Sequence, residues 1–206
     1  MKRLLFLVPL ILACGNPPPP PTPLKVTPTP TPVKVTPDPD FRDSLWGMTH
    51  GDVGNKGEVI TLTPNLDVMM EEDCHVAGFS CIAAYYFLND KLVMGKFIIT
   101  TPHADKTLYL QDYDSLVTKL TAKYGKPVQN EFFWRNDLYR NDPEQWGMAV
   151  AVGHLSRIAH WVTPRTEVWL GLKGDNYEVH LRMDYSFVSY KEDLADEMHR
   201  LQSEGL

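Results

Sequence analysis

The sequence lacks any apolar run long enough to cross a membrane as a helix, which takes about 20 residues. The longest apolar run, residues 4–13, has ten. The chain also lacks a Gly-x-Ser-x-Gly elbow, a His-Glu-x-x-His zinc motif, a phosphate-binding glycine loop and a dinucleotide fingerprint. No motif therefore assigns the protein to one of these enzyme classes.

Positive charge is scarce as well. Residues 41–206 hold sixteen Lys and Arg residues against twenty-four Asp and Glu residues, with no basic stripe. An acidic balance of this kind argues against nucleic acid and against anionic lipid head groups as partners. We therefore predict no nucleic-acid partner.

Cysteine is rare, and its three positions are informative. Cys14 follows the apolar run, whereas Cys74 and Cys81 lie well beyond it. An even pair in an exported protein favours a disulfide, so Cys74 and Cys81 are the candidates for one. The alternative is two buried free thiols, which are common in protein cores. No standard metal-ligand spacing surrounds them, and we predict neither a metal site nor a cofactor.

The first residues have the pattern of a secretory signal. Lys2 and Arg3 precede the apolar run, and a small residue, Ala13, precedes Cys14. The segment Ile11-Leu12-Ala13-Cys14 resembles the bacterial lipobox. This resemblance implies a bacterial lipoprotein with a signal peptide at 1–13 and a lipid on Cys14. Gly15, where retained lipoproteins have Asp, implies the outer membrane if the host has one. The alternative is an ordinary secretory signal with a chance cysteine.

A proline-rich segment follows, and we predict a disordered stalk over residues 14–40. Residues 16–40 hold eleven of the seventeen prolines, and Lys-Val-Thr-Pro occurs at 25–28 and again at 34–37. Such a composition favours extended polyproline II over a packed core. Alternatives are Pro-x-x-Pro units that bind a partner, or glycosylated threonines.

Residues 41–206 contain twenty-one aromatic residues and are long enough for one folded domain. Two hairpins are predicted: strands 81–88 and 91–100 flank Asn89-Asp90, and strands 166–173 and 177–185 flank residues 174–176. In the strand 177–185, apolar residues from Tyr177 to Tyr185 alternate with polar ones, which predicts a sheet with one wet face. Residues 128–134 and the second half of 148–162 also favour strand.

Helices are predicted at three places. Thr49 and Asp52 form a capping box for a short helix, and Ser189 with Glu192 caps a final one. Between them, apolar residues from Tyr113 to Tyr124 recur with helical spacing up to Gly125. The order predicts an α+β fold, an antiparallel sheet with helices packed on one face. Trp-Gly-Met occurs at 46–48 and 146–148, which raises the possibility of two helix-plus-strands units.

A family resemblance rests on few residues. Trp46-Gly47-Met48-Thr49, followed by Asp52-Val53, resembles the start of uncharacterised bacterial envelope proteins, of BamE/SmpA-type lipoproteins and of beta-lactamase-inhibitor-like domains. The Lys-Tyr-Gly-Lys-Pro segment at 123–127 is a second shared feature. The resemblance implies an envelope binding or assembly module, and it carries over no catalytic residue.

The expected function is therefore a lipid-anchored binding or scaffolding protein of the cell envelope without catalytic activity. Its partner would be an envelope protein or the cell wall, and the membrane would hold it through the lipid. Trp134, Trp146 and Trp161 are the candidates for an exposed aromatic binding surface. The alternative is a small envelope hydrolase that uses His154, His160 or His180.

Overall fold

The computed structural model of the chain describes residues 38–204. The predicted signal peptide, the lipidation site Cys14 and the stalk up to residue 37 lie outside the described residues. The elements are α1 (His50–Val53), β1 (Glu58–Thr63), β2 (Leu66–Val76), β3 (Phe79–Leu88), β4 (Lys91–Ile99), α2 (Thr107–Tyr124), β5 (Gln129–Trp134), α3 (Trp146–Ala151), β6 (Leu155–Val162), β7 (Thr166–Asp175), β8 (Glu178–Phe187) and α4 (Lys191–Glu204), with short 3₁₀ turns at Pro143–Gln145 and Val188–Tyr190.

The strands form one open antiparallel sheet of eight, so the α+β class is confirmed. The order across the sheet is β1-β2-β3-β4-β8-β7-β6-β5. Each half is a four-stranded meander preceded by a helix, α1 or α2. The halves meet where β4 pairs with β8, with Gly95 opposite Tyr185. We call this β4–β8 pairing the seam.

The two Trp-Gly-Met segments do not occupy matching positions in the two halves. The first, at 46–48, precedes α1, whereas the second, at 146–148, opens α3 between β5 and β6. The strand order shows two meanders, but the repeated tripeptide does not identify them as equivalent units.

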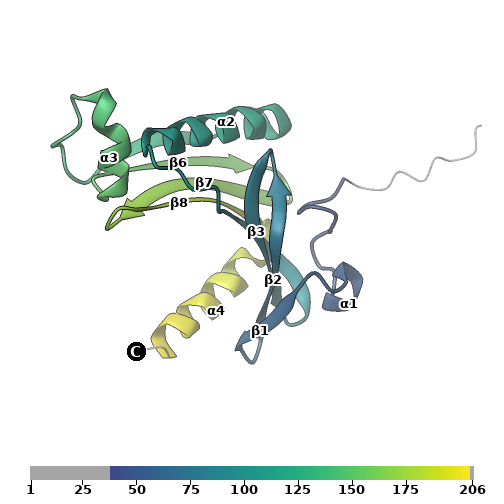
Figure 1. Ribbon diagram of the computed structural model, residues 1–206. Helices are drawn as coiled ribbons and strands as arrows, with labels where there is room; N and C mark the ends of the chain where they lie inside the picture. Colours follow the sequence, from purple (N-terminus) through teal and green to yellow (C-terminus); the bar gives the residue numbers. More distant parts are fainter. Residues whose placement is uncertain (1–37, 205–206) are drawn as a thin grey trace, which may run out of the picture. The chain divides into compact units, whose positions relative to one another are not determined.

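Helices lie on both faces of the sheet, so the predicted packing on one face is not confirmed. Figure 1 shows α2 and α3 above strands β6 to β8 and α4 below the sheet. The main core lies under α2, where Tyr113, Leu116 and Leu120 are buried against the sheet. On the other face Leu194 of α4 packs in a separate small cluster with Leu66, Leu88 and Val93.

The chain enters the fold at the seam. The Asp40 carboxylate accepts two hydrogen bonds from the Arg165 guanidinium, at 3.1 and 2.8 Å, and one from the Trp46 amide. The Phe41 ring is buried among four aromatic rings and lies directly over Gly95, where a Cβ would collide with it. These contacts of Asp40 and Phe41 lie within the compact unit that the described residues form from Asp38 on.

The hairpin turns differ in how well they follow the prediction. Asn89 and Asp90 have φ values of 50° and 58°, as a two-residue turn between β3 and β4 requires. The turn between β7 and β8 is Asn176-Tyr177, one to two residues later than predicted. Tyr177 is therefore exposed in a turn and does not share the buried face of β8.

The β2–β3 hairpin carries a disulfide between Cys74 and Cys81. The two residues are directly opposite each other in the register, their Cα atoms are 5.1 Å apart, and both are buried. Among residues 38–204, no helix has the length and apolar character needed to span a membrane.

Candidate functional site

The three candidate tryptophans do not form one surface. Trp161 is 1% exposed and donates its indole N–H to the Gly125 carbonyl, so its prediction as a surface residue is wrong. Buried and more exposed residues alternate along β6, and Trp161 is one of the buried ones. Trp134 and Trp146 are half-buried and pack edge to face at 5.8 Å.

The Trp134–Trp146 pair belongs to a cluster on the helix side of the sheet. Phe132 packs on Trp146 at 5.4 Å, and the Arg157 guanidinium lies 4.2 Å from the Phe132 ring. Arg157 is buried and donates to the Asp114 carboxylate at 2.7 Å. The Arg157 charge is therefore paired within the fold, and the main role of the cluster is to pack against the sheet.

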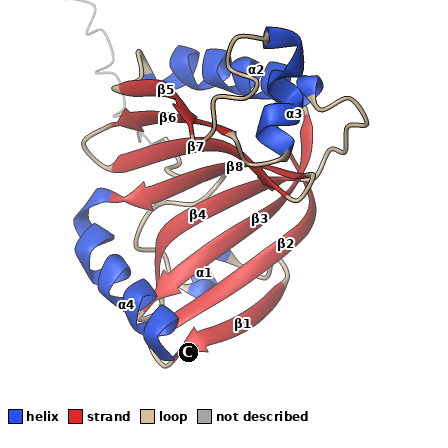
Figure 2. Ribbon diagram, turned by 90° about the vertical axis from the view of Figure 1, so that its left-hand side faces the viewer, coloured by secondary structure: helices blue, strands red, loops and turns tan. Residues whose placement is uncertain are grey.

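Among the residues that the structure describes, no helix lies on the opposite face of β5 to β8. Figure 2 looks onto this face, where α4 crosses the side of β1 to β4. Its side chains alternate with those of the core, as the pattern of β8 predicted: Leu181, Met183 and Tyr185 are buried, whereas His180 and Arg182 are exposed. We call the uncovered face of β5 to β8 the open face.

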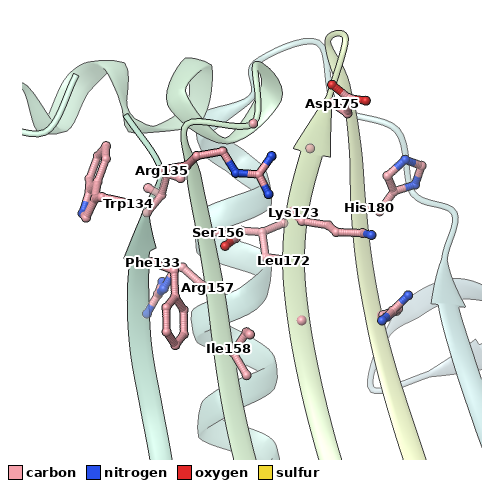
Figure 3. A pocket seen from close by; sticks show the side chains of 15 residues that line it. Phe133, Trp134, Arg135, Ser156, Arg157, Ile158, Leu172, Lys173, Asp175 and His180 are labelled. Atoms are coloured by element: carbon pink, nitrogen blue, oxygen red, sulfur yellow. The ribbon is translucent and has the colours of Figure 1, made fainter. Parts of the chain in front are cut away.

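A pocket of about 640 Å³ lies on the open face near the β7–β8 turn (Figure 3). Four basic side chains of its lining come from three parts of the sheet. Arg135 follows β5, Lys173 is on β7, and His180 and Arg182 are on β8. Phe133, Ser156 and Ile158 line its other side. We call this the cationic pocket.

The register explains why these side chains meet. Lys173 is opposite His180 and Gly171 is opposite Arg182, so all four residues point to the same side of the β7–β8 ladder. Gly171 has nothing within 4 Å of the place where a Cβ would be, which leaves the space between the cations open. Figure 3 shows Arg135 reaching across β6 toward β7, and Lys173 extending toward β8.

The charges in the cationic pocket are only partly compensated. Within residues 38–204, Arg135 and Lys173 make no ion pair. Arg182 lies 3.1 Å from the Asp184 carboxylate, which also lies 3.6 Å from Lys96. The one lining carboxylate, Asp175, is at the strand end by the turn (Figure 3).

The three candidate histidines lie apart. His180 lines the cationic pocket, whereas His160 stacks on Trp169 at 3.7 Å. Trp169 and Lys173, the partner of His180, are four residues apart on β7, which is about 13 Å along a strand. His154 lies before β6 and stacks on Tyr139. The geometry does not assemble a histidine-based catalytic set from them.

The environment of His160 affects its pKa. The ring packs flat on Trp169, and its Nε2 atom is buried without a hydrogen-bond partner among the described residues. Burial holds the pKa of His160 below its ordinary value of 6.5. His160 is therefore a neutral ring packed on the sheet at neutral pH.

No group of three or more His, Cys, Asp or Glu residues in the described part of the chain is placed to hold a metal ion. In comparisons with known proteins, the chain matches no family model, no curated protein and no solved structure. The resemblance drawn from the segment that starts at Trp46 therefore stays a prediction.

Proposed function

We propose that the protein is a non-enzymatic binding or scaffolding module of the bacterial cell envelope. A lipid on Cys14 would hold it to a membrane, the outer one if the host has two. Its binding surface would be the open face of β5 to β8, with an envelope protein or a cell-wall component as the partner.

The observation that carries this proposal is the open face itself. Helices cover the other side of β5 to β8, but this side presents a pocket in which Arg135 and Lys173 make no ion pair within residues 38–204, next to Phe133 and Ile158. Binding sites typically combine apolar surface with a few polar groups that fix the orientation of the ligand. A hydrolase is not proposed, because His154, His160 and His180 lie apart.

The binding surface can be tested by photo-crosslinking in native membranes. A photoreactive phenylalanine at position 133, which is 41% exposed, should crosslink a discrete partner. The same group at Gln111, an exposed position of α2 on the other side of the sheet, is the control. Equal products from both positions, or none from position 133, would count against the open face.

The tether requires a separate test. Replacing Cys14 with Ser should move the protein from the detergent phase to the aqueous phase in a two-phase partition, because the lipid would be lost. A Cys74→Ser variant should stay in the detergent phase. If the Cys14→Ser protein still partitions with detergent, the lipid anchor is wrong.

A further inference from the structure

We infer that the cationic pocket binds a phosphate group of the module's ligand, an inference that rests on the function proposed above. The pocket would hold the phosphate between Arg135, Lys173 and Arg182, with Ser156 and His180 as further hydrogen-bonding groups at its edge. The ligand class is a phosphorylated component of the envelope, either a single lipid head group or a soluble phosphate ester. The acidic balance argues against attraction to an anionic lipid surface, whereas one head group would be held by the local cations of the pocket.

The positive charge of the pocket stands out against the rest of the domain. The region 41–206 has eight more acidic than basic residues, so its overall field repels anions. Against this background four Lys and Arg residues line one pocket. Asp114 holds the Arg157 guanidinium on the helix side, and of the other three, Arg135 and Lys173 have no ion-pair partner among residues 38–204. An anion in the pocket would supply the missing counter-charge.

Like charges lie close together in the cationic pocket. Lys173 and Arg182 are diagonal neighbours across the β7–β8 ladder, and such pairs lie within reach of each other's long side chains. Like charges within reach of each other repel, although less than a directly opposite pair would. Asp184 lies 3.1 Å from Arg182 and 3.6 Å from Lys96. Asp175 and Glu178 lie on the same side of the ladder as Lys173, but neither forms an ion pair with it within residues 38–204, so the like charges of Lys173 and Arg182 are only partly offset. The repulsion is relieved when an oxyanion lies between the two.

The shape of the cationic pocket leaves space between the cations. Gly171 occupies the position opposite Arg182, and no atom lies within 4 Å of its missing Cβ. Any larger residue there would place a side chain between the cations. The pocket volume of about 640 Å³ leaves room for a phosphate and for part of the group that carries it.

Phosphate fits this lining better than a carboxylate does. The cationic groups approach from three separate strand segments, which suits a tetrahedral group with three or more oxygens and up to two charges. A carboxylate has two oxygens in one plane and is satisfied by a single arginine fork. The only lining carboxylate, Asp175, lies by the turn, away from Gly171 along β7 (Figure 3).

The test is a titration of the ¹⁵N-labelled full-length protein with inorganic phosphate at constant ionic strength, followed by amide chemical shifts. Shifts should be confined to amides near Gly171, Lys173 and Arg182. The double variant R135Q/K173Q should bind at least tenfold more weakly. The double variant K123Q/K126Q removes the same charge from exposed lysines at the far end of α2 and beyond it, and should bind like the unmodified protein.

Two further titrants sharpen the outcome. Acetate that shifts the same amides with equal affinity would overturn the phosphate assignment, as would phosphate shifts that survive in R135Q/K173Q. Given phosphate binding, glycerophosphoglycerol, a phosphodiester head group, separates the sources: binding points to a lipid, and its absence to a phosphate monoester. A crosslink from position 133 without phosphate binding would leave the proposed function intact and refute only this inference.

Discussion

Replacing Phe41 with Ala should be the most damaging single change near the start of the domain. Phe41 is 1% exposed, and its ring lies 5.1 Å from that of Tyr85 and 4.8 Å from that of Phe97. Removal of a buried Phe side chain costs about 3–5 kcal/mol of unfolding free energy. For a domain of this size that lowers Tm by about 6–20 °C. Phe133→Ala, the same deletion at a 41% exposed site, is the matched control and should cost far less.

The same contact allows a sharper test with Gly95→Ala. The three atoms nearest to a Cβ at Gly95 all belong to the Phe41 ring. Gly95→Ala alone should therefore destabilise by about 1–3 kcal/mol through overpacking. When Phe41 is already Ala, the same change should be neutral or slightly stabilising, because alanine is better than glycine within a strand.

The assay is urea unfolding of all four proteins of this cycle, followed by tryptophan fluorescence. Trp46 stacks 6.5 Å from Phe41 and reports on the region. The coupling free energy between the two sites should be about 1–3 kcal/mol. Additive effects would refute the reasoning, because they would mean that the Phe41 ring does not lie over Gly95.

Three further outcomes are expected. Reduction of the Cys74–Cys81 bond, whose cysteines are seven positions apart, should cost about 2–2.5 kcal/mol and lower Tm by about 4–10 °C; a reduced protein with unchanged Tm would contradict this. Burial depresses the folded pKa of His160 below 6.5, so the unfolded state binds more protons and stability falls as pH drops below about 6.5. His160→Gln should remove this contribution to the loss of stability in acid. A His160 ring with a pKa above 6.5 by NMR would show that the direction of the pKa shift is wrong. Trp46→Phe removes a buried 2.8 Å hydrogen bond to Thr166 and should cost about 1–3 kcal/mol. W46F/T166V should cost less than the sum of its parts in urea unfolding, and full additivity would argue against the bond.

The parts of the fold that were predictable from the sequence depend on local chemistry. Asn89-Asp90 tolerate the positive φ that their turn needs, and the Thr49–Asp52 capping box forms as its spacing predicts. Gly125 ends α2 with a φ of 81°. Each of these signals acts within a few residues, so no distant contact was needed to find it.

The misses come from distant contacts. Strand β1 was not predicted, because it is an edge strand with Val59 and Ile60 exposed and no alternation of burial. The β7–β8 turn lies later than predicted because Gly174 remains in the strand, where a Cβ would collide with the Val150 carbonyl of α3. That contact joins two segments that are far apart in the sequence.

The candidate site divides in the same way. The wet face of β8 was predictable, and with it His180 and Arg182. Arg135 and Lys173 were not, because the strand order that brings the end of β5 near β7 is not encoded locally. Trp161 was misplaced because the alternation of β6 was ambiguous in the sequence. A shift of one residue exchanges the buried and exposed faces of a strand.

The attachment of the chain at the seam bears on how the domain responds to mechanical load. When force is applied to the segment before Asp38, the two hydrogen bonds from Arg165 to Asp40 bear it first. It is then taken by the Phe41 ring held over Gly95 in the middle of the sheet, rather than by an edge strand that could peel away one hydrogen bond at a time. Force along the chain must therefore extract a buried aromatic ring before it can unpair any strand.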